Sequence, residues 1–258
     1  MIVPLAVTVG AHSERFAEEA RRRAGEWGLP YLERPARGGL AALLERGVRA
    51  CLVLTSDGWA LRDAQGSLAF TPGLAMVRLK RLAAGQGGDD VLVRLGELGA
   101  GDTVVDATLG LAGDALVCAR VVGPTGRVLG VEASWPLWLI VSEGLARWPG
   151  FPGSCRIEAV HGRARDVLAR LPSRGADVVT FDPMFDRPKR STPPFELLRA
   201  HALHEPLDLD TLAEARRVAR RWVVVKGGRY GKELRRLGLE AAPGRRGSPL
   251  VWARVGPA

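Results

Sequence analysis

The stretch from Val104 to Asp114, VVDATLGLAGD, combines a carboxylate, a hydroxyl and several glycines in a spacing that can bind a small ligand. A hydrophobic run typical of a buried strand leads into a turn and then a helical pattern. Glycine lets backbone N–H groups approach a ligand closely, and a helix N-terminus favours a negative group such as a carboxylate. The candidate ligand-binding residues here are Asp106, Thr108, Gly110, Gly113 and Asp114.

An acid follows at the end of the next expected strand. Glu132 comes 26 positions after Asp106, where a carboxylate can accept hydrogen bonds from both ribose hydroxyls of a nucleoside. The spacing T-x-G-x-x-G is one glycine short of the dinucleotide fingerprint, so both S-adenosylmethionine and a nicotinamide dinucleotide stay possible. Further candidate cofactor-binding residues, beside Glu132 and at the end of the third expected strand, are Ala133, His161, Gly162 and Arg163.

The corner Asp182-Pro183-Met184-Phe185 closes the fourth expected strand. The amino group on a nucleobase shares its lone pair with the ring and is a poor nucleophile. The Asp182 carboxylate and the Pro183 carbonyl can accept its N–H hydrogen bonds and stabilise the developing charge, while Phe185 stacks on the base. Asp182, which also borders the expected cofactor, Pro183 and Phe185 are therefore the predicted catalytic residues for methyl transfer to a planar amine. An Asp-Pro turn with Phe185 in the core is the alternative.

Positive charge is concentrated at two places. The formal net charge is +9, and residues 211–258 alone hold 12 basic and 3 acidic side chains. Directly after the Asp-Pro corner, Arg187, Lys189 and Arg190 form a proline-rich basic loop, which we expect to contact RNA phosphates beside the target base. An ordinary solvated surface is the alternative for both features.

Strand and helix patterns alternate from residue 103 onward, which predicts a parallel sheet covered on both faces. Strands are expected at 103–106, 127–132, 156–160, 177–182 and 222–226, helices at 113–122, 136–147, 164–171 and 209–221, and two final strands at 237–240 and 250–255. Earlier residues predict a strand at 2–9, a helix at 13–27 capped by Ser13, a hairpin around 56–58 and helices within 74–98. We therefore expect a small N-terminal α/β domain over 1–71 and a larger α/β domain over 72–258.

Composition narrows the class of protein. Cys51, Cys118 and Cys155 are odd in number and lie in or beside apolar runs, which indicates buried thiols rather than disulfides or a zinc site. No third ligand accompanies His201 and His204, so no metal is predicted. The first residues lack a basic signal-peptide region, and no apolar run reaches the ~20 residues that span a bilayer. The expectation is a soluble, cytoplasmic protein without a membrane partner.

The motifs DATLGLAGDA, GVEAS, FDPMFDRP and VVVK resemble the S-adenosylmethionine-dependent family that includes RsmJ, which methylates guanine N2 in bacterial small-subunit ribosomal RNA. FTPGLAMVRLKRL and LGLAGDALV are similar to its YpiP-like branch. The resemblance covers about residues 70–258 and is most specific over 104–188. It implies a Rossmann-like class I methyltransferase fold, cofactor contacts near Thr108, Gly110, Asp114, Glu132 and Asp182, and a target guanine near Pro183–Phe185.

Together these observations predict a seven-stranded, mostly parallel sheet that binds S-adenosylmethionine and methylates a base amino group in structured RNA. Guanine N2 of small-subunit ribosomal RNA is the expected target. A DNA or protein-amide N-methyltransferase is a second hypothesis, because the Asp-Pro corner suits any planar amine or amide. An NAD(P)-dependent oxidoreductase is a third, and a non-catalytic RNA-binding protein that retains the cofactor is a fourth.

Overall fold

A computed structural model describes residues 3–73, 75–86, 88, 90–183, 193–203, 205–242 and 250–258. The chain forms two compact units. The first unit comprises Met1–Thr71, Leu139–Trp148 and Lys189–His201, and the second comprises Pro72–Trp138, Pro149–Pro188 and Ala202–Ala258. The assignment of residues 1–71 to a separate domain stays a prediction.

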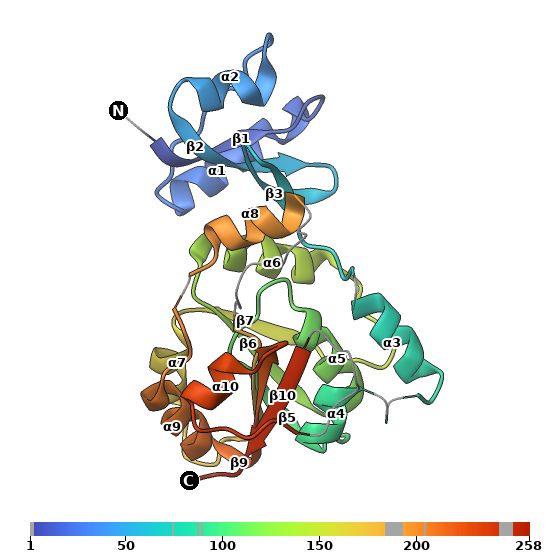
Figure 1. Cartoon of the computed structure of the whole chain (residues 1–258). Coiled ribbons are helices and arrows are strands. Elements are labelled where there is room, and N and C mark those ends of the chain that lie inside the picture. The colour runs from blue at the N-terminus through green and yellow to red at the C-terminus, as the bar shows by residue number, and fades with distance from the viewer. Residues whose placement is uncertain are drawn as a thin grey trace. The chain divides into compact units, whose positions relative to one another are not determined.

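The first unit contains a four-stranded sheet in the order β1-β2-β3-β4 (Figure 1). Its strands are β1 (Val3–Val9), β2 (Val48–Thr55), β3 (Gly58–Asp63) and β4 (Gly66–Ala69). Strands β1 and β2 are parallel, whereas β2, β3 and β4 are joined by antiparallel hairpins. The expected strand at the start of the chain and the expected hairpin around 56–58 are both present.

Helices complete the first unit. They are the 3₁₀-helix η1 (Glu14–Phe16), α1 (Ala17–Glu26), α2 (Gly39–Glu45) and α8 (Pro193–His201). The predicted cap at Ser13 is wrong, because its hydroxyl donates to the carbonyl of Ala11 at 3.3 Å and caps no helical N–H. Helix α8 contacts β4, and His201 at its end lies 3.2 Å from the carboxylate of Asp63.

The second unit is built on a six-stranded sheet in the order β10-β9-β8-β5-β6-β7. Its strands are β5 (Thr103–Asp106), β6 (Arg127–Glu132), β7 (Ile157–His161), β8 (Ala176–Phe181), β9 (Ala219–Gly228) and β10 (Leu250–Val255). Strands β5 to β9 run parallel, and β10 is antiparallel to β9. Valine-rich runs form these strands because both faces of a parallel sheet are buried.

Helices cover both faces of this sheet (Figure 1). Those on one face are α4 (Val91–Gly96) and α5 (Gly113–Val122), with α3 (Ala75–Ala83) packed on α5, and those on the other are α7 (Ala164–Arg170), α9 (Leu209–Val218) and α10 (Lys232–Arg236). The second set shares a core with Val105, Val179 and Phe181. Helix α6 (Trp135–Arg147) follows β6 in the chain, and its residues from Leu139 onward belong to the first unit. The strand–helix alternation expected from residue 103 onward is therefore present.

The strand order reverses between β5 and β8. From β5 the chain moves outward to β6 and β7, and it then returns to place β8 on the other side of β5. In open α/β sheets a crevice forms at such a reversal, outside the carboxyl ends of the strands, and ligands bind there. The topology therefore predicts a ligand-binding site at the carboxyl ends of β5 and β8.

The expected seventh strand at 237–240 is absent from the described residues, which give six strands in this sheet. Gly238 instead adopts a left-handed conformation, with φ of +68°, at the end of α10. Its N–H bonds the carbonyl of Arg235 at 3.0 Å, and the N–H of Leu239 bonds that of Leu234 at 2.8 Å. These two bonds form a Schellman cap, so the glycine ends a helix rather than lying within a strand.

Cys51 and Cys118 are buried, Cys155 is partly buried, and all three are free thiols. In the part of the chain that the structure describes, the helices are too short or too polar for any of them to cross a bilayer.

Candidate functional site

The carboxyl ends of the parallel strands bring the predicted residues of separate motifs together. Asp106 ends β5, Glu132 ends β6, and Asp182 directly follows β8. The backbone N–H of Asp182 donates to the hydroxyl of Thr108 at 2.6 Å. This bond joins the turn after β5 to the Asp-Pro corner across the reversal of strand order.

The turn after β5 has the backbone that its glycines predicted. Asp106 accepts a hydrogen bond from the N–H of Thr108 at 3.1 Å, and Gly110 has a φ of +50°. Ala112 also has a positive φ, 62°, and α5 begins at the next residue. A Cβ added to Gly113 would meet no atom of the described residues within 4 Å. The turn thus leaves open space at the helix N-terminus, where a ligand can approach the backbone.

Glu132 is held rigidly at the end of β6. Its side chain is buried, and its two carboxylate oxygens accept hydrogen bonds from the N–H groups of Gly110 at 3.0 Å and Ser134 at 2.8 Å. Burial raises the pKa of Glu132, and the backbone N–H groups oppose this rise. Each carboxylate oxygen offers about two acceptor positions, so capacity for further donors remains.

The predicted residues around β7 occupy different surroundings. His161 pairs with Glu132 across the sheet register, and its Nε2 lies 3.2 Å from the carbonyl of Ala133. The N–H of Gly162 donates to the carbonyl of Glu132 at 2.9 Å. Arg163 is exposed and forms an ion pair with Glu205 at 3.0 Å. Ala133, His161 and Gly162 therefore adjoin Glu132, whereas the guanidinium of Arg163 has an acidic partner on another segment.

A chain of partly buried ion pairs, which the sequence did not predict, holds the Asp-Pro corner. Lys226 on β9 lies 2.5 Å from Oδ2 of Asp182 and 3.6 Å from Oδ2 of Asp114. Asp114 also bonds Arg78 on α3, and Arg78 makes two bonds, of 2.7 and 3.0 Å, to Asp90. Asp90 in turn caps α4 by accepting from the next helical N–H groups. Cations and carboxylates alternate from one side of the site to the other.

These pairs set the charges of the site. Burial, helped by the nearby carboxylates of Asp114 and Asp182, raises the pKa of Asp106 to about 8. Burial also raises the pKa of Asp182, while the ammonium group of Lys226 opposes the rise. Burial lowers the pKa of Lys226, but Asp114 and Asp182 raise it more, so this lysine stays charged. The site therefore holds a fixed cation beside a carboxylate whose ionised form burial disfavours.

Arg78, Asp90 and Lys226 are the site residues missed from the sequence. Lys226 ends the VVVK motif and is a rare lysine in an arginine-rich chain, which was the available signal. Arg78 lies 36 positions before its partner Asp114. Nothing in the sequence pattern of α3 shows that the side chain of Arg78, rather than that of another arginine, bonds a residue of the site.

Several predicted residues lie outside the described residues. They are Phe185 of the Asp-Pro corner and the basic residues Arg187, Lys189 and Arg190. Among the residues that are described, no group of three or more His, Cys, Asp or Glu side chains is arranged to hold a metal ion.

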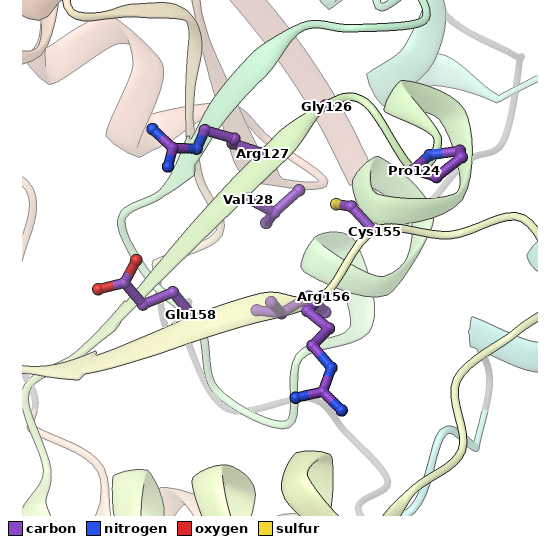
Figure 2. A pocket seen from close by; sticks show the side chains of 8 residues that line it. Pro124, Gly126, Arg127, Val128, Cys155, Arg156 and Glu158 are labelled. Carbon is purple, nitrogen blue, oxygen red and sulfur yellow. The ribbon is translucent and has the colours of Figure 1, made fainter.

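A hollow of about 540 Å³ lies elsewhere on the second unit (Figure 2). It is lined by the first residues of β6 and β7, including Arg127, Val128 and Glu158, and by Cys155. Glu132 and His161 are at the carboxyl ends of these two strands. The hollow is therefore at the opposite edge of the sheet, where the amino ends of the parallel strands lie. None of the predicted site residues that the structure describes lines it.

Comparison with known proteins decides the family. Residues 45–242 match the family model described as "Putative SAM-dependent methyltransferase". The chain belongs to this family. This S-adenosylmethionine-dependent methyltransferase is 34% identical over 220 residues to "Uncharacterized protein YpiP" of Bacillus subtilis, a match that covers 83% of this chain and 84% of that protein.

A second group of relatives has a named activity. "Ribosomal RNA small subunit methyltransferase J" of Shewanella amazonensis is 34% identical over 144 residues, which are 53% of this chain and 56% of that protein. The same enzyme of Aeromonas salmonicida is 33% identical over 156 residues, 57% of this chain and 61% of that protein. The resemblance to both branches, inferred from the motifs, is confirmed.

A solved structure supports the fold. The S-adenosylmethionine-dependent methyltransferase NGO1261 of Neisseria gonorrhoeae matches with a TM-score of 0.65 and 20% identity, and the match covers 98% of this chain and 96% of that one. The methyltransferase has a Rossmann-like fold with a mostly parallel sheet, as predicted. Family membership favours the methyltransferase hypothesis over the NAD(P)-dependent oxidoreductase.

The protonation of Asp106 generates a prediction about stability. The ordinary aspartate pKa is ~3.9, so the folded protein retains a proton that the unfolded chain has already released between that value and about 8. The stabilising contribution is complete below pH ~4 and is lost as the pH rises through the folded pKa. Asp106→Asn removes this titration but keeps an acceptor for Thr108. We expect the Tm of the wild-type protein to fall more between about pH 5 and about pH 9 than that of the variant. Equal falls in two calorimetric series would contradict a buried, protonated Asp106.

Proposed function

We propose that this methyltransferase transfers a methyl group from S-adenosylmethionine to the N2 amino group of a guanine in small-subunit ribosomal RNA. The observation that carries the proposal is the Asp182-Pro183 corner, bonded to the turn after β5 through Thr108 and to β9 through Lys226. The relatives named ribosomal RNA small subunit methyltransferase J support the choice of RNA.

The residues around the turn after β5 fit S-adenosylmethionine. Glu132 retains acceptor capacity for the two ribose hydroxyls, and the space beside Gly113 admits the methionine portion. Asp106 supports the turn by accepting the N–H of Thr108, and its buried Oδ2 has no hydrogen-bond partner among the described residues. We assign the remaining cofactor contacts to Thr108, Gly110, Asp114, Ala133, His161, Gly162, Arg163 and Asp182. When bound, S-adenosylmethionine supplies an electrophilic methyl group.

Asp182 activates the target amine in this proposal. Its side chain is 35% exposed, and Lys226 bonds Oδ2, so we assign Oδ1 to one N–H of the guanine amino group. The carbonyl of Pro183 accepts the other N–H. Two acceptors favour a pyramidal nitrogen and stabilise the positive charge that develops on it during transfer. Phe185 stacks on the guanine ring and orients its nitrogen.

Lys226 positions the carboxylate of Asp182, the proposed hydrogen-bond acceptor for the amine. Because burial disfavours an ionised Asp182, a fixed ammonium group beside Oδ2 keeps the carboxylate in its accepting form. The same ammonium group holds Asp114 at the start of α5. One cation therefore orients both the residue assigned to the target amine, Asp182 (the amine side of the site), and a residue assigned to the cofactor, Asp114 (the cofactor side). Arg78 completes this support by bonding Asp114 from α3.

Nucleoside mapping tests the proposed function. Small-subunit ribosomal RNA from a strain lacking the gene is incubated with the purified protein and S-adenosylmethionine, and modified nucleosides are located by mass spectrometry. We expect one N2-methylguanine that is missing in the deletion strain and restored by the protein. Transfer to DNA or to a protein amide, with none to this RNA, would replace the proposal by the second hypothesis. Cofactor binding without transfer to any of them would favour a non-catalytic role.

Glu132 gives a test of the cofactor side. Glu132→Gln should weaken S-adenosylmethionine binding at least about tenfold, because hydrogen bonds to a charged acceptor contribute ~1.5–3 kcal/mol each. Glu158→Gln on the neighbouring strand, at the opposite edge of the sheet, is the matched control and should bind normally. Titration calorimetry measures both. Unchanged affinity in Glu132→Gln would place the ribose elsewhere.

Asp182 gives a test of the amine side. Asp182→Ala should lower kcat by ~10²- to 10³-fold, the usual cost of removing one preorganised hydrogen bond in a transition state. Asp182→Asn should retain more activity because its amide oxygen still accepts one hydrogen bond. Single-turnover methylation rates at saturating cofactor compare the variants, with circular dichroism as the control for folding. Near-normal turnover in Asp182→Ala would rule out this mechanism of amine activation.

Lys226 predicts a change in pH dependence. Lys226→Met removes the cation that lowers the pKa of Asp182, so this pKa rises and the carboxylate is lost at a higher pH during acidification. The acid limb of the kcat profile should therefore move to higher pH. Lys226→Arg should restore most of the original profile, and Lys80→Met, an exposed lysine on α3, should leave it unchanged. A uniform loss of rate without a shift of the acid limb would show that Lys226 does not act through Asp182.

A further inference from the structure

An exposed tyrosine is displayed from the turn that follows β9. Tyr230 is 70% exposed, although its backbone is well held. The N–H of Gly231 bonds the carbonyl of Gly228 at 2.8 Å, and Arg235 donates to the carbonyl of Tyr230 at 2.6 Å. Gly231 takes a left-handed conformation, with φ of +58°, as α10 begins. The ring is therefore presented to solvent from a fixed backbone rather than covered by the core.

Positive charge surrounds this ring. The guanidinium carbon of Arg229 lies 5.9 Å from the centre of the Tyr230 ring. Residues 229–236 hold one acid, Glu233, and the basic residues Arg229, Lys232, Arg235 and Arg236. All four basic side chains are exposed, although Arg235 and Arg236 also bond the carbonyls of Tyr230 and Leu207. Other arginines of the basic tail bond partners within the fold: Arg216 bonds the carbonyls of Gly256 and Pro257, Arg217 bonds Glu214, and Arg221 bonds Asp102. The turn and α10 are thus a local concentration of the tail's charge.

The turn lies at the same edge of the sheet as the Asp-Pro corner. Phe181 pairs with Val225 in the register of β8 and β9, and the next residues, Asp182 and Lys226, are joined by their side chains. Tyr230 comes four residues after Lys226, and a chain of that length spans at most ~14 Å. Figure 1 shows α10 beside the sheet next to β9. One RNA strand can therefore contact both places.

We propose that Tyr230 and Arg229 form a stacking site for an unpaired base of the RNA substrate, next to the base that is methylated. The inference rests on the proposed function, in which the substrate is structured RNA. Unpaired bases stack on aromatic rings and on guanidinium planes, and this contact tolerates any base sequence. The neighbouring cations neutralise phosphates. A flanking base held here keeps the strand in place while the target guanine occupies the Asp-Pro corner.

Substitution of the ring tests the stack. The probe is small-subunit ribosomal RNA from the deletion strain. Tyr230→Ala should lose roughly 5- to 150-fold in affinity, the usual effect of removing one base–aromatic stack, whereas Tyr230→Phe should bind like the wild-type protein. Affinity for S-adenosylmethionine should be the same in all three proteins, which controls for folding. Equal RNA affinity of Tyr230→Ala and the wild-type protein, or an equal loss in Tyr230→Phe, would overturn the stacking site.

Salt dependence tests the role of Arg229. Arg229→Gln should reduce the slope of log affinity against log salt by about one, because the guanidinium beside the stacked base also neutralises a phosphate of the strand. Arg127→Gln, at the opposite edge of the sheet, is the matched control and should leave the slope unchanged (Figure 2). Equal slopes for the two variants would remove Arg229 from the site. A wild-type protein that does not bind the RNA would overturn the proposed function and this inference together, whereas RNA methylation that survives Tyr230→Ala unchanged would overturn the inference alone.

Discussion

The bond between Lys226 and Asp182 is the interaction on which the rest of the site depends. Ionised carboxylates with little access to water are stable only when they are paired, and the four that meet here, Asp90, Asp106, Asp114 and Asp182, would repel one another without cations. Lys226 and Arg78 supply those cations, the first from strand β9 and the second from α3. The pairing therefore does two things at once: it permits acids to gather at the end of the sheet, and it determines which of them stays ionised. Asp106 lacks such a partner and is the acid whose pKa rises most clearly.

Close packing of the turn after β5 is the second constraint. The carboxylate of Glu132 reaches back to the N–H of Gly110, so the end of β6 supports the turn directly. Leu109 lies so near β6 that a Cβ on Gly130 would be 2.5 Å from its side chain. Only glycine at 130 permits this approach. The cofactor side of the site is thus built by contacts between two strands and a turn, while the amine side is built by β8 and β9, and the hydroxyl of Thr108 joins them.

The basic tail has two physical roles. Part of its charge holds the fold, since Arg216, Arg217 and Arg221 bond carbonyls and carboxylates of neighbouring segments. Another part, around Tyr230, faces solvent at the edge of the sheet where the proposed chemistry takes place. The net charge of the tail therefore overstates how much positive charge its surface offers to a polyanion. The position of the exposed charge relative to Asp182 is a more informative guide to how an RNA strand would lie.

Local patterns in the sequence were sufficient to predict most strands and helices of the second unit. Valine-rich runs and glycine turns depend on neighbouring residues, so β5, β6, β8 and the turn at Gly110 could be predicted, and with them the positions of Glu132 and Asp182 at strand ends. The expected strand at 237–240 was wrong because Gly238 has the same sequence signature in a strand and in a helix cap, and the preceding turns of α10 decide between them. Only the tertiary structure decided the partners of Asp182 and Asp114. Their ion pairs join residues 44 and 36 positions apart, and such contacts depend on strand order and helix packing, which no local periodicity encodes.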